Sequence, residues 1–320
     1  MMKLLTWITL AAAALAGPAA AQDYPTRPVR IINPFPAGGS SDILARLIAQ
    51  GLSERLGQQF VVENRAGAAG NLGTDAVAKA APDGYTLGVS TSGPLANNKL
   101  LYKAMPYDPE KAFAPIMLIG EIPLVIAANP QVPARTLKEF VELARAQPGK
   151  QSVGHPGNGT IGHLALELVK SVTRTDMLGV AYKGDIPAMT ELLGGSIQAT
   201  SAPVSAFIAN IQAGKLNALA LTSKSRFPGL PNVPTAQEQG FDIEATVWSA
   251  MVAPAGTPRA VIERLNQEAN RIIASPEGRA RLAQFGAIAI GGPPERLASQ
   301  IAGDTAKWRR VIEAAKISIE

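Results

Sequence analysis

The chain has 320 residues, no cysteine and a formal net charge of +5. The lack of cysteine excludes a disulfide framework and a cysteine nucleophile. Its 30 basic and 25 acidic residues are spread thinly, without a Lys/Arg patch interleaved with aromatic residues, so we expect no nucleic-acid binding.

The first 21 residues follow the pattern of a secretory signal peptide. Lys3 gives a basic start, residues 4–16 form an apolar run, and Gly17-Pro18-Ala19-Ala20-Ala21 offers small residues for cleavage. A permanent membrane anchor, the alternative, would need about 20 apolar residues. We therefore expect residues 1–21 to be removed near Ala21, which leaves 320 − 21 = 299 residues for one large or two ordinary domains.

Short β-rich segments then alternate with helical patterns. The apolar residues of segment 42–56 recur at helical spacing, and Gly57 ends that pattern. The alternation predicts an α/β fold with mostly parallel sheets. The expected strands are residues 29–33, 60–63, 85–90, 152–155, 177–182, 197–201 and 216–222.

The last third of the chain reads as helical. Thr257-Pro258 and Ser275-Pro276 each place an N-cap residue before a proline suited to the first helical position. A final helix is expected over residues 295–315, with Trp308 on its packed side.

Two segments share one local order of elements. Residues 29–44 and 153–164 each read as a strand, a glycine-rich loop and a helix, which indicates one such unit in each of two domains. Ligands of open α/β sheets bind outside the carboxyl ends of the strands, so two facing units would share one cleft.

The domain boundaries follow from two apolar, proline-containing stretches. Residues 113–130 and 243–254 are the expected crossings between the domains. The predicted organisation is 22–122 plus 247–320 for domain 1 and 123–246 for domain 2.

The loop before the first predicted helix could receive an anion. Gly38 and Gly39 precede the helix start, where backbone N–H groups lack partners and the helix dipole is positive. The hydroxyl of Ser40 or Ser41 could bond either a ligand or the helix end. The alternative is a helix cap with a tight turn and no ligand.

A second glycine-rich loop follows residues 152–155. Gly157, Gly159 and Gly162 match the dinucleotide pattern G-x-G-x-x-G, but Asp176 comes too early for the acidic residue which that pattern requires. We therefore expect no nucleotide and no other cofactor at this loop.

His163 falls in the first turn of the following helix. It could donate a hydrogen bond to an anionic ligand, although a capping or surface role fits the sequence equally well. Only His155 could join it, and two histidines do not complete a zinc site, so we expect no metal.

Two further loops offer hydrogen-bond donors at strand ends. Tyr182-Lys183-Gly184 follows one expected strand, and Thr91-Ser92 follows another. The serine-hydrolase, zinc-protease and P-loop motifs are all missing from the sequence. We therefore predict a binding protein with no catalytic residues, the alternative being an exported α/β hydrolase or isomerase that acts on a small acid.

Several motifs, in this order, resemble the Bug-type, TctC-like substrate-binding proteins of tripartite tricarboxylate transporters. They include Tyr24-Pro25-Thr26-Arg27-Pro28, Pro34-Phe35-Pro36-Ala37-Gly38-Gly39, Val62-Glu63-Asn64-Arg65-Ala66-Gly67, Ala81-Pro82-Asp83-Gly84-Tyr85, Leu101-Tyr102, Gly157-Asn158-Gly159 and Ala253-Pro254-Ala255-Gly256-Thr257-Pro258.

This resemblance implies a periplasmic protein with the type II periplasmic-binding-protein (Venus flytrap) fold. Its two domains would close on a dicarboxylate, a tricarboxylate or an aromatic acid, as a monomer, for transporter subunits in the membrane or for a sensor receptor. Asp42 would hold the helix start. The implied ligand site comprises Phe35, Pro36, Ala37, Gly39, Ser40, Asp42, Thr91, Ser92, Gly157, Asn158, Gly159, Thr160, His163, Tyr182, Lys183, Gly184 and Ala202.

The chain departs from the family pattern at three places. Gly162 stands where relatives often have a polar residue, and His155-Pro156 replaces small residues before the second glycine loop. Gln198 and Ala202 stand where relatives show an acidic pair. An acid at position 202 would suit a ligand amine, so its absence argues against amino-acid ligands.

Overall fold

The computed structural model describes residues 24–317. The predicted signal peptide lies outside the described residues. Within them, no helix has the length and apolar character needed to cross a membrane.

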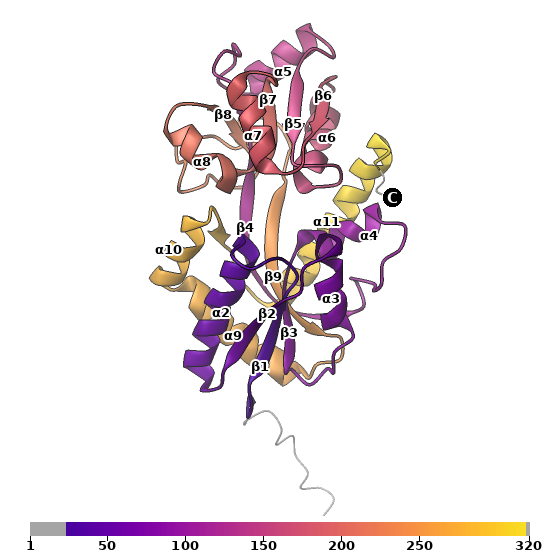
Figure 1. Ribbon diagram of the computed structural model, residues 1–320, viewed down its shortest axis with the longest axis vertical. Helices are drawn as coiled ribbons and strands as arrows, with labels where there is room; N and C mark the ends of the chain where they lie inside the picture. Colours follow the sequence, from indigo (N-terminus) through magenta and orange to yellow (C-terminus); the bar gives the residue numbers. More distant parts are fainter. Residues whose placement is uncertain (1–23, 318–320) are drawn as a thin grey trace, which may run out of the picture.

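The chain folds into two lobes, one above the other in Figure 1, connected by two long strands. We call β1–β3, α2–α4, α9 and α10 the first lobe, and β5–β8 with α5–α8 the second lobe. The first lobe begins with β1 (Val29–Asn33), α2 (Ser40–Leu56), β2 (Phe60–Asn64), the short helix η3 (Ala68–Gly70), α3 (Asn71–Ala78), β3 (Thr86–Thr91), η4 (Gly93–Asn97) and α4 (Asn98–Leu101).

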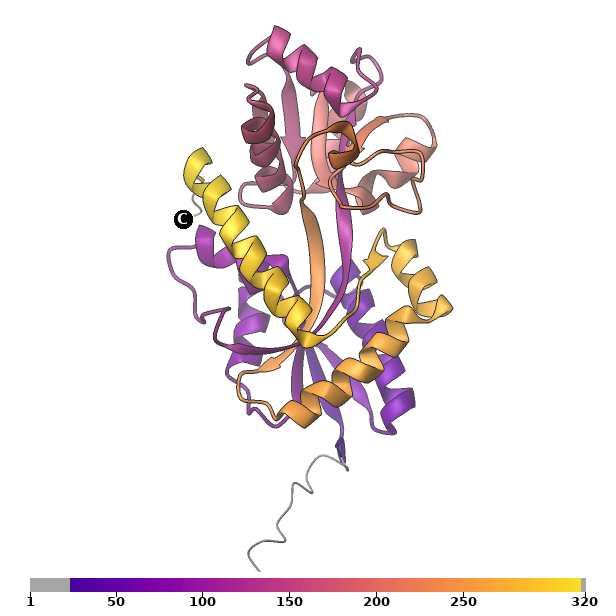
Figure 2. The same cartoon turned by 180° about the vertical axis from the view of Figure 1, so that it is seen from behind.

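The strand β4 (Phe113–Ala128) leads into the second lobe, and β9 (Thr246–Pro254) returns from it. Figure 2 shows the two strands side by side along the molecule's long axis. The second lobe contains α5 (Leu137–Ala146), β5 (Ser152–His155), α6 (Ile161–Thr173), β6 (Leu178–Ala181), α7 (Asp185–Gly194), β7 (Ala199–Pro203), α8 (Val204–Gln212), β8 (Asn217–Leu221) and the short helix η5 (Gln237–Gln239).

The remaining chain returns to the first lobe, and its last helix then packs against elements of both lobes. It comprises α9 (Arg259–Ala274), α10 (Pro276–Gln284), β10 (Ile288–Ala289) and α11 (Pro294–Ala315). Trp308 of α11 is fully buried and packs with Leu124 of β4 and Leu164 of α6, as its place on the packed side of the predicted helix requires.

The sheet is mixed, and its main path runs β2-β1-β3-β9-β4-β7-β5-β6. Parallel pairs join β1 to β2 and β3, and β5 to β6 and β7. The connecting strands β4 and β9 pair antiparallel with each other and with their neighbours. The α/β class is therefore correct, but parallel pairing is confined to each lobe, because one connecting strand leaves the first lobe and the other returns.

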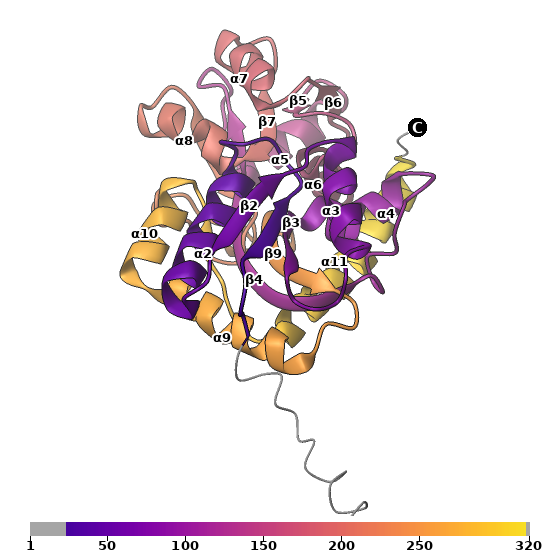
Figure 3. The same ribbon diagram turned by 60° about the horizontal axis from the view of Figure 1, so that its bottom comes forward.

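Helices cover both faces of the first-lobe sheet (Figures 1 and 3). Alternate residues of β1 point to opposite faces. Ile31 packs in the cluster formed with α2 and α9, and Ile32 packs in the cluster formed with α3 and α11. This packing fixes the carboxyl end of β1, where the first glycine loop starts.

One of the two predicted helix caps is wrong. Ser275 accepts a hydrogen bond from the N–H of Gly278 and caps α10, as expected. Thr257 does not cap α9, which begins at Arg259, because its hydroxyl donates to the carbonyl of Pro254 instead.

Candidate ligand-binding site

A cleft of about 560 Å³ lies where loops of the two lobes meet. Its first-lobe wall comes from the β1–α2 loop, the end of β3, and helices η4 and α4. Its second-lobe wall comes from the β5–α6 loop and the start of α6, and Val247 of β9 also contributes. Both lobes thus present the carboxyl ends of their parallel strands, as expected for a ligand site in an α/β protein.

Asp42 organises the first loop from within α2. Its carboxylate is buried and accepts hydrogen bonds from the Gly38 N–H at 2.9 Å, Arg46 Nε at 2.9 Å and Asn64 Nδ2 at 2.9 Å. Burial raises the pKa of Asp42, but these hydrogen bonds outweigh it, so the pKa lies below its ordinary value. Asp42 therefore holds the loop before α2 in place.

Ser41 does not cap α2; its side chain connects the same loop to β1. Its hydroxyl donates to Asn33 Oδ1 at 2.6 Å, and Asn33 Nδ2 donates to the carbonyl of Phe35 at 3.2 Å. The N-cap residue of α2 is Gly39, which makes no side-chain hydrogen bond. The helix start therefore faces the cleft without a capping side chain.

The second loop is tightened by its own hydrogen bonds. Thr160 caps α6 by accepting from the His163 N–H, and its hydroxyl donates to the carbonyl of Gly157 at 2.6 Å. Gly157 and Gly159 have φ of 142° and 72°, in the region that favours glycine. The loop thus presents Asn158, Gly159 and Thr160 to the cleft.

The chain's two histidines support this loop from behind. The rings of His155 and His163 stack with centroids 4.3 Å apart and an interplanar angle of 12°. His163 Nδ1 accepts from the Gly159 N–H at 3.1 Å, whereas His155 Nδ1 donates to the carbonyl of Gly157 at 3.1 Å. His163 therefore positions the loop and does not belong to the cleft lining.

Both histidines favour the neutral form. Burial lowers the pKa of His155 to about 4, with a further contribution from the charge of His163. Burial also lowers the pKa of His163, and nearby Glu167 only partly opposes this shift.

Gly162, one of the departures from the family pattern, allows α6 to lie close to β7. A Cβ at this position would lie 2.5 Å from the carbonyl oxygen of Ser201 and 2.6 Å from Pro156 Cδ. The residue is therefore a packing requirement for the second-lobe wall.

The first-lobe wall of the cleft includes buried amide side chains. Asn98 Nδ2 donates to Asn71 Oδ1 at 2.7 Å, and the Tyr107 hydroxyl donates to the carbonyl of Pro94 at 2.8 Å. Asn97 lines the cleft, and its buried Oδ1 has no hydrogen-bond partner among the described residues.

The structure brings together eight of the seventeen predicted site residues in the cleft lining: Phe35, Pro36, Gly39, Thr91, Ser92, Asn158, Gly159 and Thr160. Of the other nine, eight are outside that lining: Ala37, Asp42, Gly157, His163, Tyr182, Lys183, Gly184 and Ala202. The side chain of the ninth, Ser40, is not among those that the structure describes. Of these nine, Asp42, Gly157 and His163 shape the two loops, and Ala202 is fully buried in β7. Lys183 is exposed on the loop after β6.

Sequence reasoning missed other residues of the lining: Ala69, Gly93, Pro94, Asn97, Asn98, Tyr102, Ile161 and Val247. Tyr102 belongs to one of the family-like motifs, which is the signal that could have marked it. The others carry no pattern of their own.

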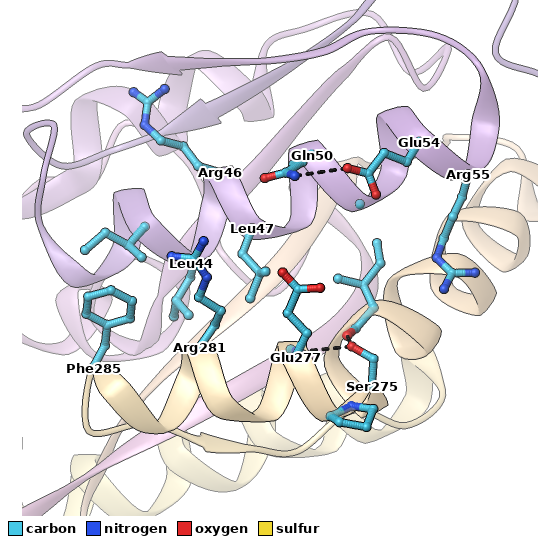
Figure 4. Close-up of a pocket in the computed structure, with 15 residues that line it drawn as sticks. Leu44, Arg46, Leu47, Gln50, Glu54, Arg55, Ser275, Glu277, Arg281 and Phe285 are labelled. Carbon is cyan, nitrogen blue, oxygen red and sulfur yellow. Dashed lines mark hydrogen bonds between the residues drawn. The ribbon is translucent and has the colours of Figure 1, made fainter.

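A larger groove, of about 630 Å³, lies away from these loops between α2 and α10 (Figure 4). Its lining combines the charged side chains of Arg46, Glu54 and Arg281 with apolar side chains that include Leu47 and Phe285. The groove lies within the first lobe, and neither glycine loop reaches it. Size therefore does not identify the ligand site here.

Metal ligands do not gather in the described part of the chain. Residues 24–317 contain no group of three or more His, Cys, Asp or Glu side chains placed to hold a metal ion.

Two α/β lobes, two connecting strands and a cleft between facing glycine loops define a two-lobed solute-binding protein. The family model for the tripartite tricarboxylate transporter family receptor matches residues 44–317. The chain belongs to this family, which confirms the predicted resemblance.

Relatives that match nearly the full length of the chain support the same family. The chain is 38% identical to Protein BugT of Bordetella pertussis over 307 residues, which cover 95% of this chain and 94% of BugT. It is 35% identical to the solved structure of R. palustris Rpa4515 with adipate, with a TM-score of 0.77 over 92% of this chain and 99% of that one. It is 34% identical to periplasmic binding protein BugD, with a TM-score of 0.73 over 93% of this chain and 100% of BugD.

These comparisons confirm the predicted two-domain binding-protein fold and a binding protein rather than an enzyme. They give no support to the exported hydrolase or isomerase.

Proposed function

We propose that the protein captures a small carboxylate in the cleft between its lobes and closes around it for transport or sensing. The observation that carries this proposal is the meeting of two glycine loops, one at the start of α2 and one at the start of α6, in a single cleft. Helix N-termini and free N–H groups favour a negative charge. The relative Rpa4515, solved with adipate, supports the same ligand class.

Domain closure would involve the predicted domains 22–122 plus 247–320 and 123–246. The long strands β4 and β9 support these boundaries, because they are the connections on which the two halves would rotate. Closure would also bring Tyr182, Lys183 and Gly184 nearer to the first lobe, as the predicted ligand site requires.

Export and partners belong to the same proposal. The signal-like sequence of residues 1–21 and the periplasmic relative BugD support cleavage near Ala21 and a periplasmic location. The partners would be transporter subunits in the membrane or a sensor receptor, with the protein acting as a monomer.

The test is a thermal-shift series on the mature protein with mono-, di- and tricarboxylates, each paired with its uncharged amide. Binding to the native state raises stability by RT ln(1 + [L]/Kd), so a ligand at 100 times its Kd contributes about 2.7 kcal/mol. We expect at least one acid, and not its amide, to raise the melting temperature. Equal effects of acid and amide, or no effect of any acid on protein freed of carried-over ligand, would contradict the proposal.

A further inference from the structure

Among the residues that the structure describes, the cleft lining contributes no charged side chain. None of the described residues that line it is Lys, Arg, His, Asp or Glu. Neighbouring charges are engaged elsewhere: Asp42 pairs with Arg46, and Lys99 pairs with Asp108 at 2.8 Å. In the cleft as the structure shows it, a ligand carboxylate relies on N–H, hydroxyl and amide donors. The cation that closure would bring nearer, Lys183, belongs to a loop beside the second glycine loop, because the Gly184 N–H donates to the carbonyl of Pro156 at 2.9 Å.

Those donors are enough for one carboxylate and are concentrated at the loops, at Gly39, Thr91, Ser92 and Asn158. The Gly159 N–H and the Thr160 hydroxyl are already engaged within the second loop. Much of the remaining wall is apolar, made by Phe35, Pro36, Pro94, Ile161 and Val247, and Tyr102 adds a phenol. A second carboxylate against this wall would lose its water without gaining a charged partner, which is costly.

One polar group in the lining lacks a partner. Asn97 is 3% exposed, and its Oδ1 accepts no hydrogen bond from the described residues. A buried acceptor without a partner is destabilising, so a donor on the ligand would relieve this cost.

On the basis of the proposed function, we infer that the preferred ligand is a monocarboxylate with an apolar body that carries one hydrogen-bond donor. The carboxylate lies at the two glycine loops, the body packs on the apolar wall, and the donor bonds to the Asn97 amide. Hydroxylated aromatic acids have this chemistry, and adipate and citrate do not.

Titration calorimetry on the mature protein tests this preference with benzoate, the three hydroxybenzoate isomers, adipate, malate and citrate. We expect one hydroxybenzoate isomer to bind at least tenfold more tightly than any of the last three acids, and more tightly than benzoate. Tighter binding of adipate, malate or citrate would overturn the inference and leave the proposed function standing. Binding of none of the seven acids would overturn the inference, and the thermal-shift series, with its wider set of acids, then decides separately whether the proposed function fails.

The variant Asn97→Leu separates recognition from folding. It keeps the side chain's approximate size and removes the amide, so we expect the preference for hydroxybenzoate over benzoate to disappear while benzoate affinity is retained. An equal loss of affinity for both acids would show a structural role only and would overturn the assignment to Asn97.

Discussion

At the scale of single residues, the site depends on groups that never touch the cleft. Asp42 is an example: it is nearly fully buried, yet it joins Gly38, Arg46 and Asn64 through one carboxylate. The conformation of the ligand-binding loop therefore depends on hydrogen bonds that also stabilise the first lobe.

Replacing Asp42 by Ala should therefore destabilise the protein. Hydrogen bonds to charged groups contribute about 1.5–3 kcal/mol each, and the loss leaves their donors unpaired, so we expect a loss of about 2 kcal/mol or more in chemical denaturation. The matched control is Glu263→Ala, which breaks another i,i+4 pair with arginine, here with Arg259 and largely exposed. That control should show no measurable change; equal effects of the two variants would contradict the role of Asp42.

The histidine pair predicts a dependence of stability on pH. The folded-state pKa of His155 is about 4, below the ordinary value of 6.5, so the unfolded chain takes up the proton first. The contribution of neutral His155 to the free energy of unfolding is complete above about pH 6.5. It is lost as the pH falls towards 4, and its total is about 3 kcal/mol. Urea unfolding from pH 7 to 4 measures it.

The variant His155→Gln removes this titration and provides the comparison. We expect the difference in stability between wild type and variant to shift in the variant's favour as the pH falls through 6.5. A difference that stays constant between pH 7 and 4 would show that His155 does not titrate as its burial implies.

At the scale of elements, the parallel units were the most predictable part of the fold. Residues 29–33 and 152–155 form β1 and β5 within the predicted limits, because short apolar runs before glycine-rich loops are a local signal. The antiparallel role of β4 and β9 was not predictable, since strand direction depends on pairing across more than 100 residues.

The site shows the same division. The two glycine loops were found because a helix start after glycines is visible in the sequence. Asn97 and Tyr102 were missed because the irregular helices after β3 give them no periodic pattern. The stacking of His155 on His163 was missed because it depends on two elements whose relative placement is a tertiary property.

The close packing of α6 on β7 predicts opposite effects for two helical glycines. Gly162→Ala would place a Cβ 2.5 Å from a backbone oxygen, and overpacking of this kind costs about 1–3 kcal/mol. Gly303→Ala in α11 meets nothing within 4 Å and should stabilise by about 0.5–1 kcal/mol through helix propensity. Thermal unfolding of the two variants checks the signs, and stabilisation by Gly162→Ala would refute the packing argument.

At the scale of the whole molecule, β4 and β9 are the structural basis for closure. They are hydrogen-bonded to each other from Phe113 to Pro123, and the second-lobe sheet continues from β4. Both lobes therefore share one sheet, while their loops face each other across a cleft. Such a connection allows rotation of the lobes about the two strands.

The most direct test of lobe closure on a carboxylate is a distance between the lobes with and without ligand. The chain has no cysteine, so Glu54→Cys on α2 and Thr190→Cys on α7 would each carry one spin label at an exposed position. Pulsed electron spin resonance should give a shorter and narrower distance distribution once a binding acid saturates the protein, and no change when Gly39→Val blocks the cleft. An unchanged distribution under saturating ligand would contradict capture by closure.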